Sequence, residues 1–118
     1  QKILSTRAKG KDTYYLPGGK RENDETDIET LVREVKEELS VNIIPSSAAL
    51  YGVFEAQAHG KAGGIKVRMT CYTAKHTGEL QAASEIAEIV WLTTADITAV
   101  SPVDRLIFAD LKEKGLLD

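Results

Sequence analysis

The sequence is poor in cysteine, methionine and tryptophan, with one residue of each among 118. A single cysteine, Cys71, excludes an internal disulfide and a cysteine-rich zinc site, and it favours a reducing compartment, so we expect a cytoplasmic protein. No apolar run approaches the roughly 18 residues that a membrane span needs, and no signal-peptide core is visible. Because Met69 is the only methionine, we expect the gene product to start elsewhere than at Gln1.

An excess of positive charge is also missing, since the formal net charge is −3. The basic surface typical of nucleic-acid-binding proteins is therefore absent, and we expect neither a nucleic-acid partner nor a membrane partner. The charge is unevenly distributed, however. Residues 20–38 hold eight acids and four bases, whereas residues 1–21 hold six bases and one acid. The small total thus combines a basic N-terminal stretch with an acidic segment.

Length and hydrophobic patterning predict a single α+β domain over residues 1–118. Thr26 and Glu29 fit a capping box, and apolar residues recur at helical spacing from there to Leu39, which predicts a helix over 26–39. A second helix should begin at Ser101-Pro102 and end near Gly115. Strands are expected over 3–8, 13–17, 50–58, 65–74 and 86–92, with a glycine-rich hairpin loop over 59–64.

Three carboxylates share one edge of the first expected helix. At about 100° per residue, Glu34, Glu37 and Glu38 fall within one arc beside the apolar stripe. Like charges at these spacings destabilise a helix by roughly 0.2–0.5 kcal/mol per pair, so the helix gains nothing unless a positive charge binds. Two interpretations remain open at this point: a solvated acidic face, partly balanced by Arg33 and Lys36, or a site for a hard divalent cation such as Mg²⁺, Mn²⁺ or Ca²⁺.

The spacing of the acidic segment favours the cation site. Gly19 is followed after five residues by Glu25, and after seven more by the run Arg33-Glu34-Val35-Lys36-Glu37-Glu38-Leu39-Ser40-Val41. This pattern, from Gly19 to Val41, resembles the Nudix box of the MutT-like Nudix hydrolases and matches its specified positions except at Ser40. The family has glycine there, at the end of the helix, where a positive φ is favoured. We therefore expect Ser40 to cost some stability without removing an acid.

The resemblance extends beyond the box and implies a fold. Leu16-Pro17-Gly18-Gly19-Lys20 looks like the family's approach to the box, and the stretch from Glu85 to Trp91 looks like a region where many members carry a further metal-binding glutamate. The family fold is an α/β/α sandwich with a mixed β-sheet between helices. Its usual first strand would lie before Ile3 and is missing from this sequence.

The resemblance also implies an activity and a set of metal ligands. Nudix hydrolases cleave a pyrophosphate bond in a nucleoside diphosphate that is linked to another group, X. They use divalent cations, so Mg²⁺ is the expected cofactor and Mn²⁺ an alternative. Glu37 and Glu38 would be metal ligands, and the backbone carbonyl of Gly18 would complete the shell. Glu34 would be either a ligand or the base that takes a proton from the attacking water.

Further residues receive supporting roles from the same resemblance. Arg33 would orient a glutamate of the box, Glu37 in our expectation, by a charge-assisted hydrogen bond. Glu25 would support the loop or a water molecule. Glu85 is the candidate for the additional metal-binding glutamate, and Glu88 is the alternative.

The phosphates of a substrate need cations outside the acidic cluster. The basic N-terminal stretch supplies them, and Arg7, on the strand before the box, is the first candidate. Lys20 and Gly19, where the box begins, are also assigned to substrate binding. We expect a small nucleotide as the substrate and a monomer or homodimer as the state of the protein.

Residues that mark some subfamilies are missing after the box. ADP-ribose hydrolases tend to carry a proline there and dinucleoside polyphosphate hydrolases a tyrosine slightly further on, whereas residues 56–59 are Ala-Gln-Ala-His. By elimination we expect hydrolysis of a nucleoside triphosphate, ordinary or modified, to the monophosphate and pyrophosphate. The alternatives are a Nudix hydrolase acting on ADP-ribose, a dinucleoside polyphosphate or a sugar nucleotide, and a Nudix module that binds nucleotides without catalysis.

Overall fold

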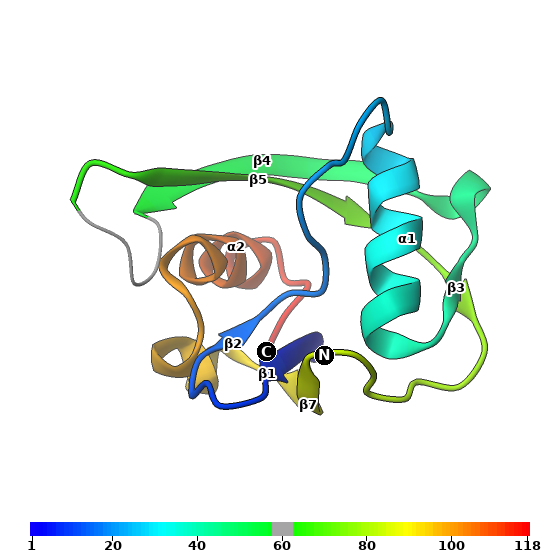
Figure 1. Cartoon of the computed structure of the whole chain (residues 1–118). Coiled ribbons are helices and arrows are strands. Elements are labelled where there is room, and N and C mark those ends of the chain that lie inside the picture. The colour runs from blue at the N-terminus through cyan, green and yellow to red at the C-terminus, as the bar shows by residue number, and fades with distance from the viewer. Residues whose placement is uncertain (58–62) are drawn as a thin grey trace.

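Three antiparallel sheets and two α-helices form the fold in this computed structural model, which describes residues 1–57 and 63–118. The β4–β5 hairpin and the β2-β1-β7 sheet lie on opposite sides of α2, and α1 stands at one side of the molecule (Figure 1). The α-helices are α1 (Asp27–Leu39) and α2 (Pro102–Glu113), and the strands are β1 (Ile3–Ala8), β2 (Tyr14–Tyr15), β3 (Asn42–Ile43), β4 (Ala49–Gln57), β5 (Lys66–Thr73), β6 (His76–Thr77) and β7 (Ile86–Leu92).

Side chains of the β2-β1-β7 sheet alternate between the two helices. Ile3 and Leu92 pack in the cluster that contains Phe108 of α2, whereas Leu4 and Ile89 pack in the cluster built on α1. Successive residues of a strand point to opposite faces, so each face of this sheet is covered by a different helix. The arrangement confirms the predicted α+β fold of the α/β/α type.

Helix α1 begins and ends as its sequence predicts. Thr26 and Glu29 form both hydrogen bonds of the capping box, at 2.8 and 3.1 Å. Ser40 closes the helix in the left-handed region, with φ of 63°, and its N–H donates to the Lys36 carbonyl. Its hydroxyl donates to the Gln81 carbonyl at 3.1 Å. Serine thus occupies the conformation for which glycine was expected, and its hydroxyl adds a hydrogen bond to the segment before β7.

The other expected elements differ from the structure mainly in length. The strand expected over 13–17 is reduced to Tyr14–Tyr15, because the chain turns away into the Pro17-Gly18-Gly19 loop. Pro102 begins α2 as expected, and the loop expected over 59–64 lies largely outside the described residues. Strands β3 and β6 and two 3₁₀ turns, Pro45–Ser47 and Thr94–Ala99, were not predicted. No helix in the described part of the chain is long and apolar enough to cross a membrane.

Candidate active site

Carboxylates from two parts of the chain meet beside the C-terminal half of α1. Glu34, Glu37 and Glu38 line a hollow of about 210 Å³ together with Ser84 and Glu85. The three helical residues were expected to lie together from their spacing. Glu85 is remote in sequence, and the structure brings it to the same hollow, as the resemblance implied.

Backbone hydrogen bonds hold the segment before β7 against the end of α1. The Gln81 N–H donates to the Leu39 carbonyl at 2.9 Å, and the Ala83 N–H donates to the Glu38 carbonyl at 3.0 Å. These are carbonyls of the last helical turn, which have no partner within the helix. Ser84 then adopts a positive φ of 57°, and Glu85 follows directly. The helix end therefore fixes the position of Glu85.

Glu88, the alternative to Glu85, takes part in a different network. Its carboxylate accepts hydrogen bonds from Arg7 Nε and the Tyr14 hydroxyl, both at 2.9 Å. Arg7 also donates to the Lys11 carbonyl at 2.9 Å. These contacts lower the pKa of Glu88 and raise that of Arg7. The structure therefore does not bring Glu88 to the acidic hollow.

The same network argues against the phosphate-binding role expected of Arg7. Its strand neighbours Thr6 and Ala8 line the large cavity described below, but Arg7 does not. Adjacent residues of a strand point in opposite directions, so Arg7 faces away from that cavity. Lys20 and Arg21 do line the cavity wall. Sequence reasoning included Arg21 in the basic N-terminal stretch expected to supply phosphate contacts but named only Arg7 and Lys20 individually.

Two glycines allow the loop before α1 to approach the helix closely. A Cβ at Gly19 would overlap the Glu34 carboxylate, so any side chain there would displace that carboxylate. Gly18 has φ of 145°, a conformation that favours glycine, and its N–H donates to Glu38 Oε1 at 3.1 Å. These contacts explain why glycine is needed where the box begins.

Arg33 joins the loop to the helix, though not through the glutamate we expected. Its guanidinium donates to both carboxylate oxygens of Glu25, at 2.7 and 3.0 Å, and to Glu34 Oε1 at 2.6 Å. Glu37 is only an ion-pair neighbour, at 3.6 Å. Arg33 holds the pKa of Glu25 down to about 2. The arginine thus contacts both Glu34 on the helix and Glu25 in the loop before it.

Glu38 has the most perturbed carboxylate in the hollow. Its pKa is raised from 4.5 to about 7, mainly by burial and in part by the nearby charges of Glu34, Glu37 and Glu85, while the hydrogen bond from Gly18 opposes the change. A carboxylate whose pKa is raised by other carboxylates lies in a site that favours a positive charge. Perturbed groups of this kind in a concave site are typical of functional sites.

The side chains around the hollow fit a hard cation in their chemistry, although they do not form a closed ligand set as they lie. Within residues 1–57 and 63–118, no group of three acidic, histidine or cysteine side chains is close enough to hold one ion. Arg33 draws Glu34 to one side, so binding would require carboxylates to turn into the hollow. The donors are all oxygens, which is the ligand type that Mg²⁺ and Mn²⁺ prefer.

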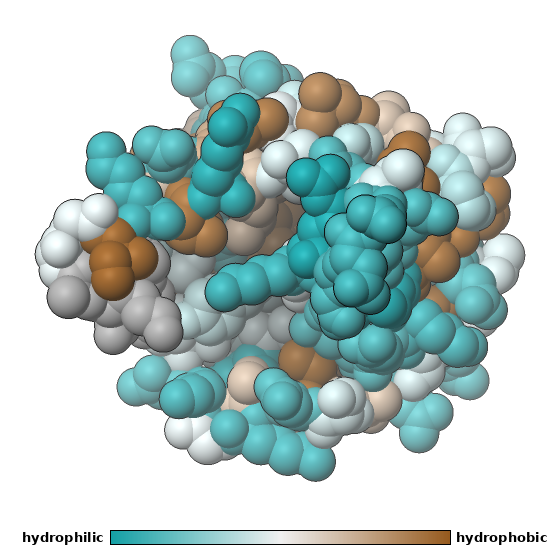
Figure 2. Space-filling model, turned by 45° about the horizontal axis from the view of Figure 1, so that its top comes forward, coloured by the Kyte–Doolittle hydropathy of each residue, from teal (hydrophilic) through white to brown (hydrophobic). Residues whose placement is uncertain are grey.

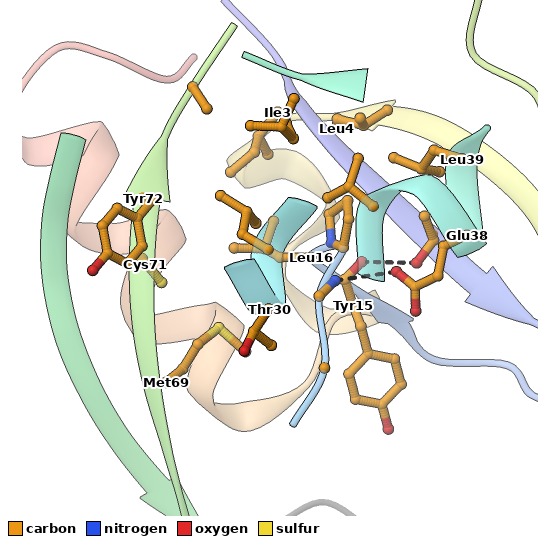
Figure 3. A pocket seen from close by; sticks show the side chains of 18 of the residues that line it. Ile3, Leu4, Tyr15, Leu16, Thr30, Glu38, Leu39, Met69, Cys71 and Tyr72 are labelled. Atoms are coloured by element: carbon orange, nitrogen blue, oxygen red, sulfur yellow. Dashed lines mark hydrogen bonds between the residues drawn. The ribbon is translucent and has the colours of Figure 1, made fainter. Parts of the chain in front are cut away.

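A larger cavity of about 1050 Å³ adjoins the acidic residues and shares Glu38 and Glu85 with the hollow. Figure 3 shows Glu38 and Leu39 at one side of it and Met69, Cys71 and Tyr72 of β5 at the other. Seen from outside, the surface is hollowed beside α1, where hydrophilic side chains gather (Figure 2). An apolar cavity with acids and four cations, Lys2, Lys20, Arg21 and Arg68, at its wall is typical of a ligand site.

A hollow of carboxylates beside a cavity of this kind is a candidate site for a cation together with a small ligand. The family model of the NUDIX domain matches residues 1–111, and the chain therefore belongs to the Nudix family. It is a Nudix hydrolase, of a family that hydrolyses pyrophosphate bonds in nucleoside diphosphate-X compounds and generally uses divalent metals. No curated protein sequence matches the chain.

Solved structures share the fold at low sequence identity. The solution structure of the E. coli ORF135 protein has a TM-score of 0.73 at 24% identity, covering 99% of this chain and 86% of its own. A MutT NUDIX hydrolase from Burkholderia pseudomallei has a TM-score of 0.74 at 22% identity, covering 92% and 86%. The E. coli dihydroneopterin triphosphate pyrophosphohydrolase has a TM-score of 0.69 at 19% identity, covering 92% and 84%. At these identities the likeness concerns the fold alone.

Proposed function

We propose that this protein is a Mg²⁺-dependent diphosphatase that hydrolyses a nucleoside triphosphate, ordinary or modified, to the monophosphate and pyrophosphate. The observation that carries the proposal is the meeting of Glu34, Glu37, Glu38 and Glu85 around one hollow at the edge of the large cavity. At about 1050 Å³ the cavity matches the upper range of small-molecule sites, roughly 300–1,000 Å³, and has room for a nucleotide.

The carboxylates of the hollow would hold the cation. Glu37, Glu38 and Glu85 are the proposed ligands, and the Gly18 carbonyl is a further candidate. Such a cation would offset the charge of the phosphates, polarise a phosphoryl oxygen and acidify a bound water, and Mn²⁺ would serve as an alternative to Mg²⁺. Because the acids alone would repel a triphosphate, the protein also needs cations near it. Lys20 lines the cavity wall together with Arg21, and we assign the phosphate contacts to these two residues in place of Arg7.

The sequence leaves two roles open for Glu34, metal ligand or the base that takes a proton from the attacking water. Its contacts favour the role of base. Arg33 donates to its Oε1 at 2.6 Å. Oε2, the oxygen beside Gly19, has no hydrogen bond among the described residues and can accept the proton of the attacking water. The water oxygen then bonds to one of the two phosphorus atoms of the cleaved P–O–P bridge as the bridging oxygen leaves with the other phosphorus, so that the monophosphate and pyrophosphate are released. Arg33 keeps its charge throughout and holds the glutamate in place.

The test is incubation of the protein with Mg²⁺ and a panel of ordinary and oxidised nucleoside triphosphates, ADP-ribose, a dinucleoside polyphosphate and a sugar nucleotide. We expect pyrophosphate and a monophosphate from one or more triphosphates. The matched controls are Glu38→Gln, which should be inactive, and Glu113→Gln, an exposed helical glutamate on α2 that should retain activity. Cleavage of ADP-ribose or another X compound alone would contradict the substrate class. Nucleotide binding without turnover of any compound would contradict catalysis.

A further inference from the structure

A buried carboxylate outside the acidic hollow holds the chain that leads into it. Asp104, in the first turn of α2, is fully buried, and its Oδ2 accepts a hydrogen bond from the Leu16 N–H at 2.9 Å. Burial raises the pKa of Asp104 to about 6, although Leu16 and the nearby Ser101 lower it. Burying an ionisable group is unfavourable unless its contacts compensate, so packing alone does not explain an aspartate here.

The segment that Asp104 holds reaches the active site within two residues. Leu16 is followed by Pro17 and then by Gly18, whose N–H donates to Glu38 Oε1 at 3.1 Å. The proline ring fixes φ at Pro17 and leaves little freedom between the two hydrogen bonds. A displacement at Leu16 is therefore passed on to the hydrogen bond that Glu38 accepts.

The start of α2 is itself fixed against β2. The Ser101 N–H donates to the Tyr14 carbonyl at 3.2 Å, and Val100 forms a parallel bridge with Tyr14. Helix α2 then packs through Phe108, which is fully buried. Asp104 consequently lies on a part of α2 that is held in place by hydrogen bonds to β2 and by packing. Its second oxygen, Oδ1, is buried with no hydrogen-bond partner among the described residues, so the contact with Leu16 is its main polar interaction.

We propose that Asp104 is a positioning residue for the reaction. By holding the Leu16 N–H, it fixes the Pro17-Gly18-Gly19 loop against α1 and thereby fixes Glu38 in the orientation that the reaction needs. Asp104 touches neither the hollow nor the large cavity, so it acts only through this loop. The inference rests on the proposed function for its effect on turnover, but the effect on loop geometry is independent of it.

Three variants of the full chain test the proposal. Asp104→Asn keeps an oxygen that can accept the hydrogen bond, and Asp104→Leu removes it at similar size. Val103→Ala, at a buried neighbour on the same helical turn, controls for lost packing. The readouts are the amide proton shifts and hydrogen exchange of Leu16 and Gly18 by NMR, together with kcat and KM.

In Asp104→Leu we expect both amides to shift and exchange faster, and kcat to fall roughly ten- to hundredfold. Asp104→Asn should stay close to the wild type, and Val103→Ala should lower Tm but keep the Gly18 amide and kcat. A wild-type Gly18 amide in Asp104→Leu, or an equal displacement in Val103→Ala, would overturn the proposal. If Asp104→Leu does not fold, a displaced Gly18 amide in Asp104→Asn overturns it. Absence of hydrolysis by the wild type would count against the proposed function, while the amide shifts would still decide the role of Asp104.

Discussion

Replacing Asp104 by asparagine should change how the stability of the protein depends on pH. The pKa of Asp104 is raised from 3.8 to about 6, chiefly because the side chain is buried. A group whose pKa is higher in the folded than in the unfolded state contributes stability that is complete below the unfolded pKa. That contribution is lost as the pH rises through the folded pKa, here between about 4 and about 6. A separation of about two pKa units corresponds to about 3 kcal/mol.

The asparagine side chain is neutral at every pH, so the variant should not show this loss. This loss of stability can be measured by urea unfolding of both proteins from about pH 4 to about pH 7. Across this range, the difference in free energy of unfolding between the variant and the wild type should increase in favour of the variant by up to about 3 kcal/mol. Asp110→Asn is the matched control on the same helix: Lys114 and Tyr51 lower the pKa of Asp110 below 3.8, so its contribution is lost only below that pH, and the difference in free energy of unfolding between this variant and the wild type should stay nearly constant across the range. Parallel profiles for wild type and Asp104→Asn would refute the reasoning.

Three further variants follow from the contacts of the site. Gly19→Ala should lower kcat roughly a hundredfold with an unchanged circular dichroism spectrum, because its Cβ displaces the Glu34 carboxylate; a wild-type kcat would contradict this. Ser40→Gly should raise the free energy of unfolding by up to about 1 kcal/mol in urea titrations, because φ at this position is 63°, and a loss of stability would show that the serine hydroxyl matters more. Glu85→Gln should raise the Mg²⁺ concentration for half-maximal activity about tenfold or more, whereas Glu88→Gln should leave it unchanged, and the reverse order would exchange their roles.

The features that local sequence determines were predictable. The capping box at Thr26, the left-handed residue at Ser40 and the helical start at Pro102 depend on neighbours within a few positions, and each is found in the structure. The three helical glutamates of the hollow were likewise expected, since helical geometry alone places them together.

The features that could not be predicted from the sequence depend on contacts between distant parts of the chain. Nothing in the sequence shows that Arg7 pairs with Glu88 across β1 and β7, where neither residue lines the acidic hollow or the large cavity. Glu85 could be chosen only by resemblance, because hydrogen bonds to the end of α1 determine its position. The link from Asp104 to Leu16 spans 88 positions of the sequence. An aspartate in a first helical turn looks like an ordinary favourable interaction with the helix dipole.

The most direct test of the central claim compares Glu38→Gln with the wild type in pyrophosphate release from nucleoside triphosphates in the presence of Mg²⁺. Glutamine keeps the size of the side chain and an oxygen for the Gly18 N–H, but it removes the charge at a half-buried carboxylate among three others. Catalysis in the acidic hollow requires that the wild type releases pyrophosphate and that the variant, with the same circular dichroism spectrum, releases none above background. A Glu38→Gln protein that turns over at the wild-type rate would contradict it.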